Sequence, residues 1–145
     1  MQVPYNFNEA SLVLPDAYGL VDRSRQFLQV QTSNGTKLTL IIARAPADDD
    51  SLQSFMEKGL VEHRRSLRGF NLLSCTERRY PDLVGIEVRF QFVDKAEGPV
   101  FHHEFHCVLG EERIGFHVIS AVADLEECDA WTQAMLESVA IREEG

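Results

Sequence analysis

The chain has 145 residues, the usual length of one domain, and a formal net charge of −9. Nucleic acid and anionic membrane surfaces are therefore excluded as partners, because binding to their phosphates requires a basic patch that this sequence lacks. The content of 44% hydrophobic and 26% charged residues is typical of a globular protein and argues against disorder.

Cysteine content and the absence of targeting segments indicate a compartment. The three cysteines cannot all pair within one chain, and we expect buried thiols in a reducing environment. The N-terminal residues lack the basic region and apolar run of a secretory signal, and no apolar run is long enough to span a bilayer. We therefore expect a cytoplasmic protein with no direct membrane insertion. Since no repeat or linker is present, residues 1–145 should form a single domain.

Three strands are expected first. An apolar stretch over residues 7–14 ends at Pro15. Residues 25–31 alternate between two unlike faces, which is typical of a strand. Residues 37–44 should pair with them in a hairpin across Ser33-Asn34-Gly35, because Asn and Gly tolerate the left-handed backbone of a tight turn.

A helix should follow these strands. Asp50 is placed to cap its start, with Gln53 reaching back three residues later. Gly59 falls on its apolar stripe, where a glycine costs roughly 1 kcal/mol relative to alanine. Close approach of another backbone is the usual justification, and that backbone would belong to a strand of the same domain or to a bound helix. The apolar stripe consists of Leu52, Phe55, Met56, Leu60 and Leu67.

The second half of the chain predicts four strands and a final helix. The helix should start near Asp124, with Glu127 placed for a capping box, and run through Val139. Short connections favour an α+β fold, in which an antiparallel sheet of about six or seven strands packs against two helices. The four expected strands are residues 70–79, 84–93, 100–109 and 113–122.

The second strand of the hairpin is fairly apolar on both faces. Leu38 and Leu40 point to one side, whereas Thr39 and Ile41 point to the other. Such a strand needs cover on both sides, and two helices are few for seven strands. Either the sheet curls on itself or a partner covers its second face.

A histidine cluster is the strongest candidate for chemistry. On a strand, His102, Glu104 and His106 would share one face, with His103 on the other and His117 on a neighbouring strand. Two histidines and a carboxylate are the ligands of some metal-dependent enzymes. We favour a solvated or hydrogen-bonded strand face, because two ligands spaced two residues apart on one strand do not by themselves complete a metal site. No serine elbow, activated cysteine or glycine-rich phosphate loop is present, so we expect no metal, no cofactor and no catalysis.

Three segments carry a family resemblance. They are Phe7 to Asp16 with the following Asp22-Arg23-Ser24, the helix exit Leu67 to Phe70, and the stretch Ala130 to Met135. In this order they resemble the DcrB-like family, and within it the Eag-type chaperones of type VI secretion effectors. The resemblance spans nearly the whole chain. It implies a curved antiparallel sheet with helices, assembled as a homodimer with a cup-shaped surface. Such chaperones shield the N-terminal transmembrane helices of an effector in the cytosol before the effector is loaded onto the secretion spike.

The resemblance also implies which residues bind the client. Arg25 and Phe27 stand where the chaperones present alternating aliphatic residues, and Gly59 and His103 stand where they carry polar ones. Phe27 and Ile41 would supply apolar contact, and Gly59 room for a close backbone. The predicted client-binding set is Arg25, Phe27, Thr39, Ile41, Gly59 and His103. The alternative is a non-catalytic module of the same fold that binds a small ligand or a soluble protein.

Overall fold

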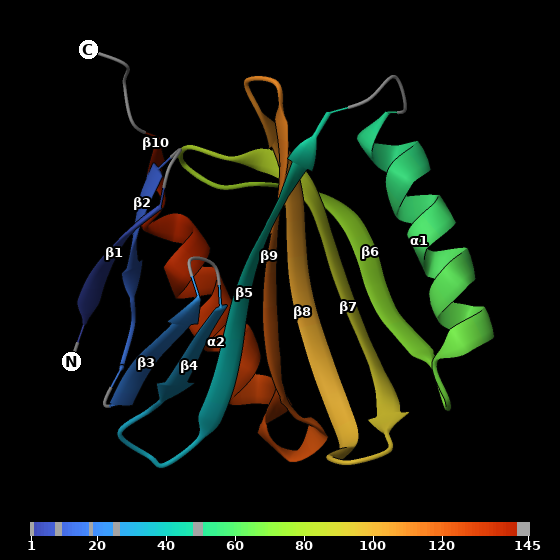
Figure 1. Ribbon diagram of the computed structural model, residues 1–145, viewed down its shortest axis with the longest axis horizontal. Helices are drawn as coiled ribbons and strands as arrows, with labels where there is room; N and C mark the ends of the chain where they lie inside the picture. Colours follow the sequence, from blue (N-terminus) through green and yellow to red (C-terminus); the bar gives the residue numbers. More distant parts are fainter. Residues whose placement is uncertain (1, 8–9, 18, 25–26, 48–50, 142–145) are drawn as a thin grey trace.

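Ten strands and two α-helices make up the part of the chain that the computed structural model describes, residues 2–7, 10–17, 19–24, 27–47 and 51–141 (Figure 1). A three-stranded antiparallel sheet has the order β1-β2-β10, formed by Val3–Phe7, Ala10–Leu14 and Ala140–Ile141. The second, larger sheet is also antiparallel, with the order β3-β4-β5-β9-β8-β7-β6. Its strands are β3 Gly19–Ser24, β4 Phe27–Gln31, β5 Lys37–Pro46, β6 Asn71–Arg79, β7 Val84–Asp94, β8 Gly98–Leu109 and β9 Glu112–Ala121.

The main core lies on one face of the seven-stranded sheet. The helix α2 (Leu125–Glu137), which follows a short 3-10 turn at Val122–Asp124, packs on β8 and β9 behind the sheet, and the three-stranded sheet lies beside it (Figure 1). In β4, β5, β8 and β9 the side chains alternate so that every second one faces this core. Fully buried side chains of the core include Leu28, Leu38, Leu40, Phe101, Phe105, Phe116 and Met135. We call this the α2 face of the sheet.

The opposite face carries a smaller core under α1 (Leu52–Ser66), which packs on β7 and β8 and lies toward the β6 edge of the sheet (Figure 1). Met56 is the one buried residue of this helix, and it packs in one cluster with Ile86, Val88 and Phe90 of β7. We call this the α1 face. Two helices therefore lie on opposite sides of the sheet, and α1 covers only part of its side.

The predicted fold class is confirmed, with three strands added. The α+β architecture, the hairpin at Gly35 (φ 84°) and both helices are as expected. The stretch expected at residues 7–14 is instead the end of β1 and the whole of β2, while β3 and β10 were not expected.

Both predicted helix starts differ in detail. Asp50 lies outside the described residues, and the side chain of Ser51 caps α1 by accepting from the Ser54 amide. Glu127 does not complete a capping box: it accepts hydrogen bonds from the hydroxyls of Thr32 (2.9 Å) and Thr36 (2.6 Å). It therefore ties the β4–β5 turn to the start of α2, a contact across more than 90 residues that local spacing does not reveal.

The expectation of three buried thiols holds for two cysteines and is wrong for the third. Burial raises the pKa of the Cys107 and Cys128 thiols to about 12, so both stay protonated. Cys75 is exposed on β6, which forms the edge of the seven-stranded sheet. Among the described residues, neither α-helix is both long enough and apolar enough to cross a membrane.

Candidate functional site

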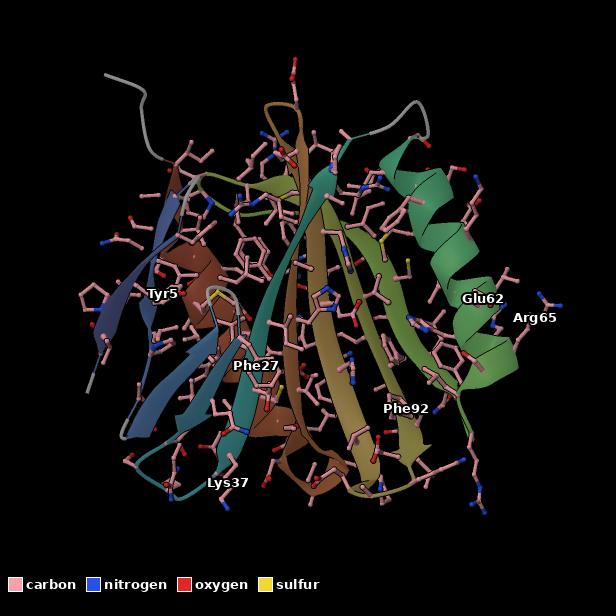
Figure 2. All side chains as sticks on the ribbon, in the orientation of Figure 1. Tyr5, Phe27, Lys37, Glu62, Arg65 and Phe92 are labelled. Atoms are coloured by element: carbon pink, nitrogen blue, oxygen red, sulfur yellow. The ribbon has the colours of Figure 1, made fainter. Side chains whose placement is uncertain are left out.

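The α1 face has an uncovered part over β4, β5 and β9. Cross-strand pairing sets Phe27 opposite Ile41 and Gln29 opposite Thr39, and Thr39 is in turn opposite Ile119 of β9. All five side chains are half-buried, and no helix of the described residues packs on them. Figure 2 shows Phe27 beside β5 and Phe92 near α1, with the central strands between them. The exposed surface is therefore a mixture of apolar and hydrogen-bonding groups on a continuous sheet.

A pocket of about 400 Å³ lies next to this surface, between α1 and the sheet. Apolar side chains form most of its walls, among them Met56, Leu60, Phe90 and Phe92. His102, His106, His117 and Glu104 line it as well, so a mainly apolar pocket has one polar wall. Such a combination is typical of sites that bind an apolar body and recognise one polar group.

Gly59 lines this pocket from α1. The sequence predicted that the backbone of either a strand of the domain or a bound helix approaches this glycine. A Cβ added there would meet no heavy atom within 4 Å, so no strand of the domain approaches it closely. The glycine leaves open space rather than packing against the sheet.

Gly59→Ala should therefore raise the free energy of unfolding by about 1 kcal/mol, because alanine is favoured over glycine in a helix interior and nothing resists the added methyl group. Urea unfolding followed by circular dichroism measures the change. A destabilised variant would contradict the open surroundings of residue 59.

The polar wall is a buried carboxylate surrounded by imidazoles. Glu104 is 5% exposed. His102 Nδ1 lies 3.1 Å from its Oε2, His106 Nε2 lies 2.9 Å from its Oε1, and His117 Nδ1 lies 3.1 Å from its Oε2. Burial alone would raise the pKa of Glu104, but the hydrogen bonds from the three histidines outweigh it and hold that pKa well below its usual range. The carboxylate is therefore ionised. The prediction that His102, Glu104 and His106 share one face of their strand is confirmed.

His103 belongs to a different cluster on the α2 face. Its Nδ1 lies 2.7 Å from Asp129 Oδ1, and its Nε2 lies 3.2 Å from Glu87 Oε2 without the alignment of a hydrogen bond. Tyr80 donates its hydroxyl to Glu87 at 2.6 Å, and Arg89 makes a two-pronged pair with Asp129. This cluster ties β7 and β8 to α2, and sequence reasoning missed it because its members come from distant segments.

The six residues predicted to bind a client are thus only partly brought together. Phe27, Thr39 and Ile41 share the uncovered surface, and Gly59 lies on α1 on the same side of the sheet. His103 is 4% exposed and lies on the opposite face, so it is not part of that surface. Arg25 lies outside the described residues.

No family model and no curated protein matches this chain, whereas solved structures of the same fold exist. The protein PA94 from Pseudomonas aeruginosa, described as of unknown function, has a TM-score of 0.70 at 20% identity, with 99% of each chain covered. LpqN of Mycobacterium tuberculosis, involved in cell envelope biogenesis, has a TM-score of 0.71 at 10% identity over 99% of this chain and 91% of its own. Cyanobacterial PsbP from Synechocystis has a TM-score of 0.64 at 13% identity, covering 97% and 92%. At these identities the similarity shows a shared fold.

Proposed function

We propose that this protein is a non-catalytic cytoplasmic chaperone, which binds apolar transmembrane helices of a secreted effector on the α1 face of its sheet. The observation that carries the proposal is the uncovered surface of β4, β5 and β9, where Phe27 and Ile41 are half-buried and no helix of the described residues packs on them. The type of client, an N-terminal region of a type VI secretion effector, is the one that the DcrB-like resemblance implies. So is the homodimer, which belongs to the proposal.

The chemistry of the surface suits such a client. A transmembrane helix in water exposes a large apolar area, and burying it contributes about 25 cal/mol per Å². Transmembrane helices also carry small and polar residues that seek hydrogen-bond partners. Thr39 and Gln29 offer such partners between the apolar side chains of Phe27, Ile41 and Ile119.

Room for a close backbone is available on the facing helix. Gly59 has no heavy atom within 4 Å of the position of a Cβ, so a client helix could approach α1 there without displacing a side chain. The net charge of −9 would keep a protein with an apolar surface soluble.

Co-expression with the N-terminal apolar region of an effector encoded nearby tests the proposal. Size-exclusion chromatography without detergent should give a soluble complex, while that region alone is insoluble. Light scattering on the same column measures whether the unloaded protein is a dimer. A folded protein that never co-elutes with this region would refute the chaperone function and leave the fold.

The double variant Phe27→Ala/Ile41→Ala should abolish co-elution, because removing both side chains weakens apolar binding roughly 100-fold. Its thermal midpoint should fall by only a few degrees, since both side chains are half-exposed. Val61→Ala/Val93→Ala is a matched control, because it removes two exposed aliphatic side chains elsewhere on the molecule. If Phe27→Ala/Ile41→Ala unfolds instead, these two side chains belong to the core of the domain rather than to a binding surface.

The pocket under α1 favours one alternative, a small apolar ligand with a polar group. Its volume of about 400 Å³ and its single polar wall fit a ligand of modest size. Mass spectrometry of the protein under native conditions would reveal a co-purified molecule. In that case the Phe27→Ala/Ile41→Ala variant, which leaves the pocket walls intact, should retain the ligand.

A further inference from the structure

We propose that Glu104, His106 and His117 bind one divalent transition-metal ion of the zinc class. Each of the three residues offers one ligand atom, and these atoms lie within 4.8 Å of one another. Two imidazoles and one carboxylate are a common ligand set for zinc, and they leave at least one coordination position open. This inference is independent of the chaperone proposal, because the uncovered surface of β4 and β5 contributes no ligand.

The distances are close to those of a bound ion. His106 Nε2 lies 2.9 Å from Glu104 Oε1, and His117 Nδ1 lies 3.1 Å from Glu104 Oε2. Zinc bonds of about 2.0–2.1 Å separate neighbouring ligand atoms by roughly 3.3 Å in a tetrahedron. For an ion to bind, His106 Nε2 and His117 Nδ1 would lose the protons that they donate to Glu104, and the side chains would adjust to bring the three ligand atoms, which lie within 4.8 Å of one another, to this spacing.

The ligands are held by the centre of the sheet rather than by loops. Glu104 of β8 pairs directly with His117 of β9, and His106 follows two residues later on the same face. The side chains of Glu104 and His106 are 7% and 8% exposed, whereas His117 is 23% exposed on the pocket side. A site built on paired strands is preorganised, which lowers the cost of binding.

His102 fits the role of a positioning residue. Its Nδ1 donates to Glu104 Oε2 at 3.1 Å, while its ring stacks on Phe90 with centroids 4.8 Å apart. Metal-ligating carboxylates are usually fixed by such a hydrogen bond.

Gly115 gives the two imidazole rings their space. A Cβ at this position of β9 would lie 2.8 Å from His117 Nε2 and 2.9 Å from His106 Nδ1. Glycine weakens a strand interior, and its presence often marks a site where another group must approach closely. Here the groups that approach are the two proposed imidazole ligands.

Metal binding by the tag-free protein is the test. After dialysis against a chelator, titration with Co²⁺ should give a visible absorption band that saturates at one equivalent and is abolished by Zn²⁺. Elemental analysis should then find one zinc per chain, and the thermal midpoint should rise by several degrees with zinc. A wild-type protein that binds less than a stoichiometric amount of either ion would overturn the proposal.

Variants locate the site. Glu104→Gln and His117→Gln should each weaken zinc binding at least about 100-fold, and His102→Phe, which keeps the stacking on Phe90, about 10-fold. His63→Gln is the matched control, since His63 lines the same pocket from α1 outside the ligand set and should bind zinc as the wild type does. Circular dichroism verifies that each variant is folded. Unchanged affinity in folded Glu104→Gln and His117→Gln would place the ion elsewhere and also overturn the proposal.

Discussion

Gly85→Ala should lower the free energy of unfolding by about 3 kcal/mol or more, the upper end of the cost of overpacking. A methyl group on this residue of β7 would lie 2.0 Å from the backbone oxygen of His106 and 2.9 Å from Cζ of Phe105. The oxygen belongs to the backbone of β8, so it cannot rotate away as a flexible side chain would. For a domain of this size, thermal unfolding should shift down by roughly 10 °C.

Gly59→Ala provides the comparison, because the same chemical change occurs where nothing lies within 4 Å. The two variants should shift the unfolding midpoint in opposite directions. If Gly85→Ala stays within 1 kcal/mol of the wild type, β7 and β8 lie further apart at this point than the structure has them.

Acid should also lower the free energy of unfolding, because it removes the stabilisation that comes from Glu87. Burial raises the pKa of this carboxyl, but the polar contact of His103 at 3.2 Å, the hydrogen bond from Tyr80 and the charges of His103 and Arg78 outweigh it and lower the pKa from 4.5 to about 2. Because the folded pKa is depressed, the stabilisation is fully present above the unfolded pKa and is lost as pH falls toward 2. This difference corresponds to a loss of up to about 3 kcal/mol between pH 5 and 2.

Urea unfolding at a series of pH values, compared between the wild type and Glu87→Gln, isolates this contribution. The variant should lose that part of the acid dependence, because its amide does not titrate. Glu77→Gln, which changes an exposed carboxylate on the neighbouring strand β6, should keep the wild-type profile. Identical profiles for Glu87→Gln and the wild type would contradict the role of the His103 cluster in acid stability.

Most of the fold was predicted correctly from the alternation of side chains between the two faces of a strand. The alternation of Val88 and Phe90 with Glu87 and Arg89 follows from the two-residue period of a strand, and in the structure these two pairs lie on opposite faces of β7. The three unexpected strands have weaker local signals. In β1 the segment Val3–Phe7 contains a proline and an asparagine, which are depleted in strands, and β10 has only two residues.

For the candidate sites, the sequence predicted which residues of one strand share a face, but not which residues of different strands lie side by side. Parity placed His102, Glu104 and His106 together, and it separated them from His103. It could not show that His117 pairs directly with Glu104, since that depends on which strands are neighbours. The signal that sequence reasoning passed over was Gly115, a glycine inside an otherwise regular strand.

The attachment of α1 has a consequence for the internal motions of the molecule. Apart from Met56, its apolar side chains are partly buried or exposed. Segments with little buried apolar contact open at a lower free-energy cost than the whole domain. Amide hydrogens of α1 should therefore exchange with solvent through local opening, well before those of β8 at the centre of the sheet.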